Sequence, residues 1–311
     1  MSHARRNGFE RIAVVELGTN AVRSMLARVR PGVGFTVLDE ERARTRLGGR
    51  DHRMSATAIR ETLRAVDAFI GDSGEPRPRL VAVATAAVRE ARNARTLLDA
   101  LRRRHAVDVR VLSGEEEAEL AALAAMFSLP LTRARVVDLG GGSLQVARVD
   151  DGRTHVIGSV PLGVLTMTRR FLPGARATET QVMALRREVR LEAGRLLRHA
   201  GPGSLIGLGG SVRALARMHA AHAHRARRQI HGLRLHADDV RALRERIQRL
   251  PVRRRHELPG LKAERADTIL AGAVIVEEIL ALARQTLLTV CGRGVRHGVL
   301  IRETFGAGGI V

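Results

Sequence analysis

The order of apolar and polar positions divides this chain into short strands and longer helices. Its opening apolar segments are rich in Val, Ile and Leu and lie between turn residues, which predicts strands at 12–17, 21–29 and 35–44. Apolar positions three and four residues apart then predict helices at 55–70 and 94–104. Further strands are predicted at 80–85 and 107–112. A helix at 114–127 follows, and Pro130 prevents it from continuing.

The second part of the chain has the same succession of elements, with additions. Three strands are predicted at 135–139, 144–149 and 154–161. A fourth apolar strand begins at Ser204 and breaks into Gly209 and Gly210 before a helix. The other predicted elements are helices at 163–171, 178–199, 237–249, 263–284 and 297–303, and a strand at 287–290. Strands that alternate with helices in this way predict an α/β protein.

One pentapeptide occurs twice with an acid at the same place. Val14-Val15-Glu16-Leu17-Gly18 and Val136-Val137-Asp138-Leu139-Gly140 match position by position. In both copies a turn leads into a second strand. Similar openings so far apart in the sequence predict two related domains rather than a short-period solenoid. We place these domains at 1–130 and 131–311.

Glycine-rich turns follow several of the predicted strands. Glycine permits positive φ and lets a backbone approach a ligand without Cβ atoms, so neighbouring N–H groups can converge on an anion. A carboxylate such as Asp138 at the strand end could hold a divalent cation beside that anion. A single turn of this kind is equally typical of an ordinary hairpin. Three such turns favour a phosphate-bearing ligand, at 18–20, 140–143 and 209–211.

The start of the helix at 114–127 carries adjacent glutamates with different expected roles. Ser113 and Glu116 have the spacing of a capping box, which gives Glu116 a structural role. Glu117 instead shares a helix face with Leu120 and Ala124. Burial there would raise its pKa toward that of a general base. The alternative is that Glu117 only complements the helix dipole.

Composition narrows the functional classes. The chain carries a net charge of +21 and would attract polyanions, but it has no Trp or Tyr and only 6 Phe, so stacking platforms for nucleic acid are scarce. Nucleic acid is therefore an unlikely partner. No apolar run is long enough for a membrane span and the N-terminus has no signal-peptide pattern, so we expect a cytoplasmic protein without membrane contact. The single Cys291 excludes an internal disulfide and is expected to be a buried apolar residue.

Two further groups of residues are not interpreted as sites. Four histidines lie in an Arg-rich and Ala-rich stretch without the spacing of metal ligands, which favours a solvated helix face followed by a loop: His219, His222, His224 and His231. Two basic runs, at 102–105 and 253–256, are expected to be helix ends and surface, although either could line a path for a long polyanion.

Six segments, taken in order, resemble the exopolyphosphatase/guanosine pentaphosphate phosphohydrolase (Ppx/GppA) family. One is Asp138-Leu139-Gly140-Gly141-Gly142-Ser143, the others are at 15–23, 84–91, 113–118, 161–163 and 207–211, and together they are specific. The length resembles the short, two-domain form of the family. The resemblance implies two actin-like, ribonuclease-H-like domains with the site in the cleft between them, and a homodimer stays open as the quaternary state.

The same resemblance implies a reaction and a set of residues. The reaction is Mg²⁺-dependent hydrolysis of a terminal phosphoanhydride in inorganic polyphosphate or guanosine pentaphosphate. Glu117 matches the catalytic carboxylate that activates water, and Asp138 matches the metal-associated acid, with Glu16 at the corresponding place in the first domain. The matching phosphate contacts are Gly18, Thr19, Asn20, Arg23, Arg89, Gly141, Gly142, Ser143, Gly209, Gly210 and Ser211.

Five positions depart from the family pattern. Glu16 replaces Asp, Ala21 replaces Ser, Leu144-Gln145 replaces Thr-Glu, and His297 stands where Glu is common. A weakened enzyme, or a binder of polyphosphate or guanosine polyphosphate without turnover, is therefore the second hypothesis. Kinase-like chemistry on the same fold is disfavoured, because the matching segments are those of the phosphatase branch.

Overall fold

The chain forms two compact units in a computed structural model that describes residues 8–49, 51–74, 76–222 and 229–306. The first unit comprises the residues up to Leu120 and those from Val295 onward, and the second comprises Ala121–Gly294. The chain passes from the first unit to the second within one helix, α4 (Gly114–Ser128), and returns at the start of α10 (Val295–Phe305). These units differ from the predicted domains 1–130 and 131–311 in two ways: the first border falls after Leu120, and α10 belongs to the first unit.

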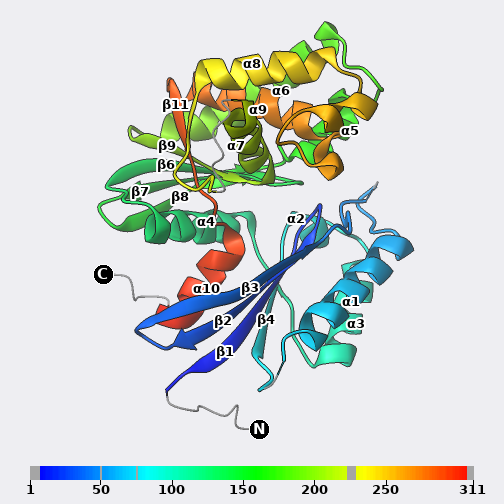
Figure 1. Cartoon of the computed structure of the whole chain (residues 1–311), viewed down its shortest axis with the longest axis vertical. Helices are drawn as coiled ribbons and strands as arrows, with labels where there is room; N and C mark the ends of the chain where they lie inside the picture. Colours follow the sequence, from blue (N-terminus) through cyan, green and yellow to red (C-terminus); the bar gives the residue numbers. More distant parts are fainter. Residues whose placement is uncertain (1–7, 50, 75, 223–228, 307–311) are drawn as a thin grey trace. The chain divides into compact units, whose positions relative to one another are not determined.

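The first unit is a five-stranded mixed sheet with helices on both faces (Figure 1). Its strand order is β3-β2-β1-β4-β5, where β1, β2 and β3 are antiparallel and β4 and β5 run parallel to β1. The strands are β1 (Glu10–Leu17), β2 (Val22–Arg30), β3 (Gly34–Ala43), β4 (Arg79–Ala84) and β5 (Arg110–Val111). The helices other than α4 and α10 are α1 (Ala56–Gly71), α2 (Ala86–Arg89) and α3 (Ala94–His105).

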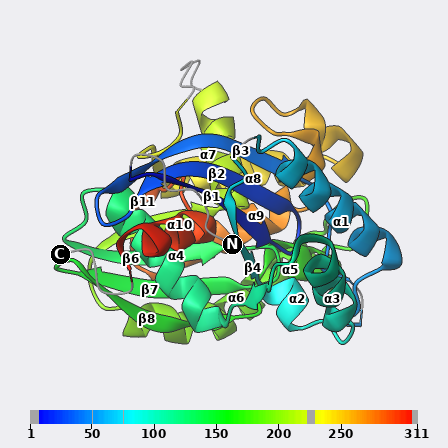
Figure 2. The same ribbon diagram turned by 90° about the horizontal axis from the view of Figure 1, so that it is seen from below.

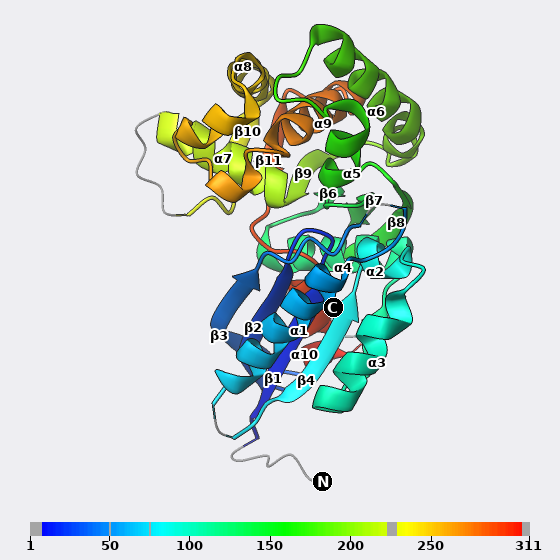
Figure 3. The same cartoon turned by 90° about the vertical axis from the view of Figure 1, so that its right-hand side faces the viewer.

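Alternation along β1 explains why this sheet needs two helical layers. Val15 and Leu17 belong to a core with apolar residues of α1 and α3. Ile12 and Val14, which point to the other face, belong to a core with Val299 of α10. A strand whose side chains are buried on both faces reads as a continuous apolar run, as β1 does. Figure 3 shows α1 and α3 on one face of this sheet and α10 on the other.

The second unit is a six-stranded mixed sheet of order β10-β11-β9-β6-β7-β8. Figure 2 shows β6, β7 and β8 side by side; they form an antiparallel meander, and β9 pairs parallel to β6. The strands are β6 (Arg133–Leu139), β7 (Leu144–Asp150), β8 (Arg153–Val160), β9 (Ser204–Gly209), β10 (Arg234–His236) and β11 (Leu287–Val290). The helices are α5 (Val164–Phe171), α6 (Glu179–His199), α7 (Gly210–His222), α8 (Ala237–Arg249) and α9 (Ile269–Leu282).

Helix α9 is the centre of the second unit. Of its 14 residues, 11 are buried, so it is enclosed on most sides and packs among α5, α6, α7 and α8. Two short 3₁₀ helices, η1 (Val252–Glu257) and η2 (Ala263–Arg265), connect α8 to it. No helix of the described residues is both long enough and apolar enough to cross a bilayer.

Most predicted elements are confirmed, and the differences have physical causes. The helix predicted at 263–284 is wrong at its start, because 263–265 form a 3₁₀ turn and α9 begins only at Ile269. Arg265 in that turn is buried, so tertiary contacts override its helical propensity. The strand predicted at 107–112 is reduced to the two residues of β5. Helix α2 and strand β10 were too short for a periodic signal.

Candidate functional site

The turn that joins β1 to β2 in the first unit is a closed four-residue loop, Gly18 to Ala21. The N–H of Gly18 donates to the Ala21 carbonyl at 3.2 Å. A Cβ at residue 18 would lie 2.8 Å from that carbonyl oxygen, so the loop requires glycine there. The carbonyls of Thr19 and Asn20 accept from the N–H groups of Gly48 and Arg46 at 3.0 and 3.3 Å. The turn is therefore fixed by the segment that precedes α1.

The acid that precedes this turn is paired across the sheet. Glu16 on β1 lies opposite Arg23 on β2, and their side chains form an ion pair of 2.7 Å. Glu16 is buried, so the guanidinium compensates a charge that is shielded from water. Both residues were predicted to belong to a site, Glu16 as a metal ligand and Arg23 as a phosphate contact. The structure brings them into direct contact with each other.

Glu117 lies in the first turn of α4 and is only 5% exposed. One guanidinium nitrogen of Arg89 donates to the Glu117 carboxylate and also to the Leu112 carbonyl, the latter at 2.6 Å. The predicted capping box is confirmed, because Ser113 Oγ accepts from the Glu116 N–H at 3.0 Å and Glu116 accepts from the Ser113 N–H at 2.8 Å. Glu116 is thus bound to the helix end, whereas Glu117 is buried beside Arg89.

The strand register gathers these residues at one edge of the first sheet. Strands β1, β4 and β5 are parallel, and their carboxyl ends meet where the Thr85 N–H donates to the Leu17 carbonyl and the Leu112 N–H donates to the Ala84 carbonyl. The Gly18 turn, α2 with Arg89, and the start of α4 with Glu117 all follow these strand ends. In parallel α/β sheets ligands bind outside the carboxyl ends of the strands.

The second unit repeats the loop geometry between β6 and β7. The Gly140 N–H donates to the Ser143 carbonyl at 3.0 Å, as Gly18 does to Ala21. The carbonyls of residues 140–142 accept from the first N–H groups of α5 and from Gly163. A Cβ at Gly163 would lie 2.1 Å from the Gly142 carbonyl carbon, so helix and turn are in close contact.

That contact determines which groups of the turn can bind an anion. The turn carbonyls occupy the N-terminus of α5, so this helix end cannot also hold a phosphate. Among the described residues, no carbonyl accepts from the backbone N–H groups of Gly141 and Gly142. Neighbouring backbone N–H groups of this kind are the donors from which anion-binding concavities are built.

The turn after β9 lies against Asp138. Gly209 has φ +97°, and a Cβ there would lie 2.2 Å from the Leu139 carbonyl oxygen and 3.0 Å from Asp138 Oδ1. The structure therefore brings Asp138 together with the predicted Gly209 and Gly210. Ser211, also predicted as a phosphate contact, is 1% exposed and lies against α9, where a Cβ at Gly272 would be 2.8 Å from its Oγ.

Arg265 lies at this turn, although no sequence pattern predicted it there. A Cβ added at Gly210 would lie 2.1 Å from its Nη2, so the guanidinium rests on the backbone where α7 begins. The side chain comes from η2, 55 positions further along the chain, and is buried. Two adjacent glycines at 209 and 210 signal that something approaches the backbone closely, but nothing local in the sequence says what.

Gln145 on β7 lies directly opposite Asp138 on β6. It is 2% exposed, and its side-chain amide nitrogen donates to Ser143 Oγ at 2.6 Å and to Ser159 Oγ on β8 at 3.2 Å. The side chain that replaces the family's glutamate is therefore a hydrogen-bond donor to the glycine turn.

The residues not interpreted as sites have other partners. His231 lies between the Ser128 carbonyl and the Gly292 N–H, and His219 lies 3.7 Å from Asp239. His224 lies outside the described residues. Within the described part of the chain no three His, Cys, Asp or Glu side chains are placed to hold a metal. Cys291 is buried as predicted, and burial raises the pKa of its thiol.

One basic residue departs from the predicted surface role. Arg255, in the run at 253–256, is 2% exposed and donates to the carbonyls of Leu250 and Ala266 at 3.3 Å. Burial lowers the pKa of its guanidinium to about 10. The prediction that this whole run lies on the surface is wrong for this residue.

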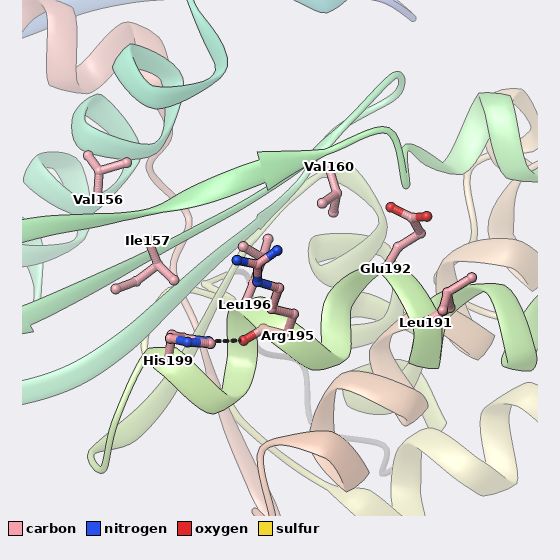
Figure 4. A pocket seen from close by; sticks show the side chains of 8 residues that line it. All are labelled: Val156, Ile157, Val160, Leu191, Glu192, Arg195, Leu196 and His199. Atoms are coloured by element: carbon pink, nitrogen blue, oxygen red, sulfur yellow. Dashed lines mark hydrogen bonds between the residues drawn. The ribbon is translucent and has the colours of Figure 1, made fainter.

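A cavity of about 510 Å³ in the second unit contains none of the predicted site residues. Figure 4 shows it between β8 and α6, and its lining is Val156, Ile157, Val160, Leu191, Glu192, Arg195, Leu196 and His199.

Comparison with known proteins decides the family. The sequence profile of the Ppx/GppA phosphatase family matches residues 25–305. The chain belongs to this family. It is 33% identical to an uncharacterized protein of Streptomyces coelicolor over 94% of this chain and 90% of that one. It is 28% identical to exopolyphosphatase 1 of Mycobacterium tuberculosis over 94% and 88% of the two chains.

Solved structures agree with this Ppx/GppA assignment. The Aquifex aeolicus family member has a TM-score of 0.81 and 26% identity, and the alignment covers 97% of this chain and all of that one. An exopolyphosphatase from Cytophaga hutchinsonii has a TM-score of 0.87, with 23% identity and coverage of 96% and 98%. The predicted α/β fold is confirmed, with two mixed sheets and a match to a solved structure of the Ppx/GppA family.

Proposed function

We propose that this Ppx/GppA protein is a phosphohydrolase that releases the terminal phosphate of inorganic polyphosphate or guanosine pentaphosphate. The observation that carries the proposal is the buried Glu117 carboxylate held by Arg89 at the carboxyl end of the first sheet. A carboxylate shielded from water and oriented by a neighbouring cation is a suitable general base for an attacking water. Relatives named exopolyphosphatase support the substrate class.

Glu117 would accept the proton of the water that attacks the terminal phosphorus. Its pairing with Arg89 favours the ionised form, which a base requires. The water's oxygen forms the new bond to phosphorus while the bond to the bridging oxygen breaks, and the shortened chain leaves as an anion. Phosphoryl transfer of this kind depends on positioning and charge neutralisation more than on covalent chemistry.

The second unit supplies donors for the phosphate oxygens. The N–H groups of Gly141 and Gly142, the hydroxyl of Ser143 and the guanidinium of Arg265 all lie at the ends of β6 and β9. In the first unit, Thr19, Asn20 and Arg23 would likewise donate hydrogen bonds to phosphate oxygens. Preorganised donors that face developing negative charge are the largest contribution to many such reactions.

Family membership implies a divalent cation, and the donor set fits one. Mg²⁺ is commonly bound by one or two carboxylates together with substrate phosphates and water. Asp138 beside the Gly209 turn offers such a carboxylate, whereas its counterpart in the first unit, Glu16, is already paired with Arg23. When bound, the ion would neutralise charge on the transferred phosphate.

The test is phosphate release from polyphosphate and from guanosine pentaphosphate by purified protein, with and without Mg²⁺. Glu117→Gln should reduce kcat by at least about 10²-fold, the low end of a general base's contribution. Glu115→Gln is the matched control, because it removes an exposed carboxylate two residues away on the same helix. Release by Glu117→Gln at the parental rate would show that another group is the base.

A second function is supported by Gln145 and by the Glu16–Arg23 pair. Both reduce the negative charge available to hold metal ions, which a protein that only binds a polyanion does not need. Such a protein would bind inorganic tripolyphosphate and release no phosphate at saturating Mg²⁺. Turnover that depends on Glu117 would exclude this second function.

A further inference from the structure

We propose that Gln145 is a positioning residue that fixes Ser143 as a hydrogen-bond donor, so that the Gly140–Ser143 turn grips a phosphate oxygen directly instead of through a cation. This inference rests on the proposed function, since it concerns how the same turn holds its substrate. It deepens that function by assigning a role to a buried side chain that touches no substrate itself.

The direction of one hydrogen bond carries the argument. The side-chain nitrogen of Gln145 donates to Ser143 Oγ at 2.6 Å. An amide N–H can only donate, so the serine oxygen must accept with one of its lone pairs. The single proton of Ser143 is then directed away from Gln145. The second hydrogen of the same nitrogen is directed at Ser159 Oγ at the longer distance of 3.2 Å.

Burial makes this orientation stable. Gln145 is 2% exposed and Ser143 is 5% exposed, so bulk water cannot readily exchange for either partner. Ser143 ends the turn in which no carbonyl of the described residues accepts from the N–H groups of Gly141 and Gly142. The four-residue loop then carries three hydrogen-bond donors for one anion: the Ser143 hydroxyl and the N–H groups of Gly141 and Gly142.

A carboxylate at position 145 would reverse the arrangement. Ser143 would donate its proton to the carboxylate, and the loop would lose that donor for the phosphate. The new charge would lie opposite Asp138 in the β6–β7 register, and two facing carboxylates are a typical magnesium-binding arrangement. The residue at 145 therefore decides whether this turn meets phosphate by hydrogen bonds or through a cation.

In the first unit, too, a hydrogen-bond donor lies opposite the acid that precedes the glycine turn. Arg23 holds the position opposite Glu16 that Gln145 holds opposite Asp138. Arg23 Nη1 donates to Glu16 at 2.7 Å. In both sheets the acid that precedes the turn faces a donor rather than a second acid.

Binding of inorganic tripolyphosphate, measured by calorimetry with and without Mg²⁺, tests the inference. The Glu117→Gln background prevents hydrolysis during the titration. In that background Gln145→Glu should weaken binding without Mg²⁺ at least about tenfold, the loss of one charge-assisted hydrogen bond. It should also make binding more dependent on Mg²⁺. Gln145→Met keeps the side-chain volume but cannot donate a hydrogen bond to Ser143, so it should weaken binding about threefold. If Gln145→Glu does not fold, Gln145→Met alone provides the test.

Two matched variants separate a role through Ser143 from a structural one. Ser159→Ala removes the other hydrogen-bond partner of the Gln145 amide. Tripolyphosphate binding should stay within about twofold of that of the parent, the size of effect typical of a surface substitution. In a Ser143→Ala protein, Gln145→Met should have no further effect. Equal losses from Ser159→Ala and Gln145→Met, or an undiminished loss in the Ser143→Ala protein, would overturn the inference.

The kinetic arm distinguishes this inference from the proposed function. In the protein with Glu117 intact, Gln145→Met should raise KM with kcat nearly unchanged, because it removes binding common to substrate and transition state. A parent that releases no phosphate would refute the proposed hydrolysis. The calorimetric comparison would still decide the role of Gln145.

Discussion

Arg89 and Glu117 form the most consequential pair in the first unit: the guanidinium of one lies against the carboxylate of the other, although 28 residues separate them in sequence. The arginine ends the short helix after β4, and the glutamate begins the helix after β5. The Arg89 side chain is 27% exposed, while that of Glu117 is 7% exposed. The proposed base is therefore buried, and its counter-ion lies nearer to solvent, where the proposed function would bring it to a substrate phosphate.

Removal of this arginine should harm both stability and turnover. Arg89→Met leaves a buried carboxylate without its cation, which costs about 3 kcal/mol in comparable pairs. Urea unfolding measures the first effect and phosphate release at saturating substrate the second. If the two residues act as a pair, Arg89→Met in a Glu117→Gln protein should destabilise by much less than it does alone. Additive losses in free energy would contradict a functional pairing.

Gly210→Ala should displace Arg265 without unfolding the protein. The new Cβ would overlap the Arg265 guanidinium, which is the movable end of a flexible side chain. KM for polyphosphate should rise about tenfold, the value of one charge-assisted contact. Gly174→Ala is a matched control in the same unit, because residue 174 is exposed and a Cβ there makes only ordinary contact. An unchanged KM would mean that Arg265 does not contact phosphate.

Glu278 should be a large contributor to the stability of the second unit. It lies on α9 with 2% of its side chain exposed and accepts from Arg186 and Arg190 of α6, the latter at 2.6 Å. Glu278→Ala would leave the Arg186 guanidinium partly buried without this acid and should lower the free energy of unfolding by about 3 kcal/mol. Glu257→Ala, which breaks an exposed pair with Arg254, should have a much smaller effect. Chemical denaturation of both variants is the measurement.

The contact between β3 and α10 should weaken in acid. Glu40 on β3 accepts from His297 at 3.1 Å and from Arg296 at 2.7 Å. These contacts, first the hydrogen bond from His297, lower the pKa of Glu40 from 4.5 to about 2. Because the folded pKa is depressed, the stabilisation is complete above pH 4.5 and is lost as the pH falls toward 2.

Glu40→Gln measures that contribution. It should lower the free energy of unfolding by about 1 kcal/mol at neutral pH, because the Glu40 side chain is 36% exposed and solvent screens the pair. The difference from the parent should shrink between pH 4.5 and 2. The exposed Glu61 on α1 provides the control substitution, Glu61→Gln. A difference that stays constant over this pH range would show that the ion pairs do not cause it.

Local pattern was sufficient for the elements and the turns. The alternation in β1, the caps at Ser55 and Ser113, and the glycines at 18 and 140 all act within a few residues, so the sequence alone predicts them. The repeated pentapeptide likewise predicted two related sheets, and Glu16 and Asp138 occupy the same register in each. The burial of Glu117 followed from its helix face.

Partners remote in sequence were decided only by tertiary structure. Packing placed Arg265 against Gly210, turned Ser211 toward Gly272, and paired Arg23 and Arg89 with the two acids. Each of these contacts joins separate elements, and side-chain charge and size do not specify which distant atom will be met. The sequence thus determined which residues could do chemistry here, and the packing of strands and helices determined which of them face one another.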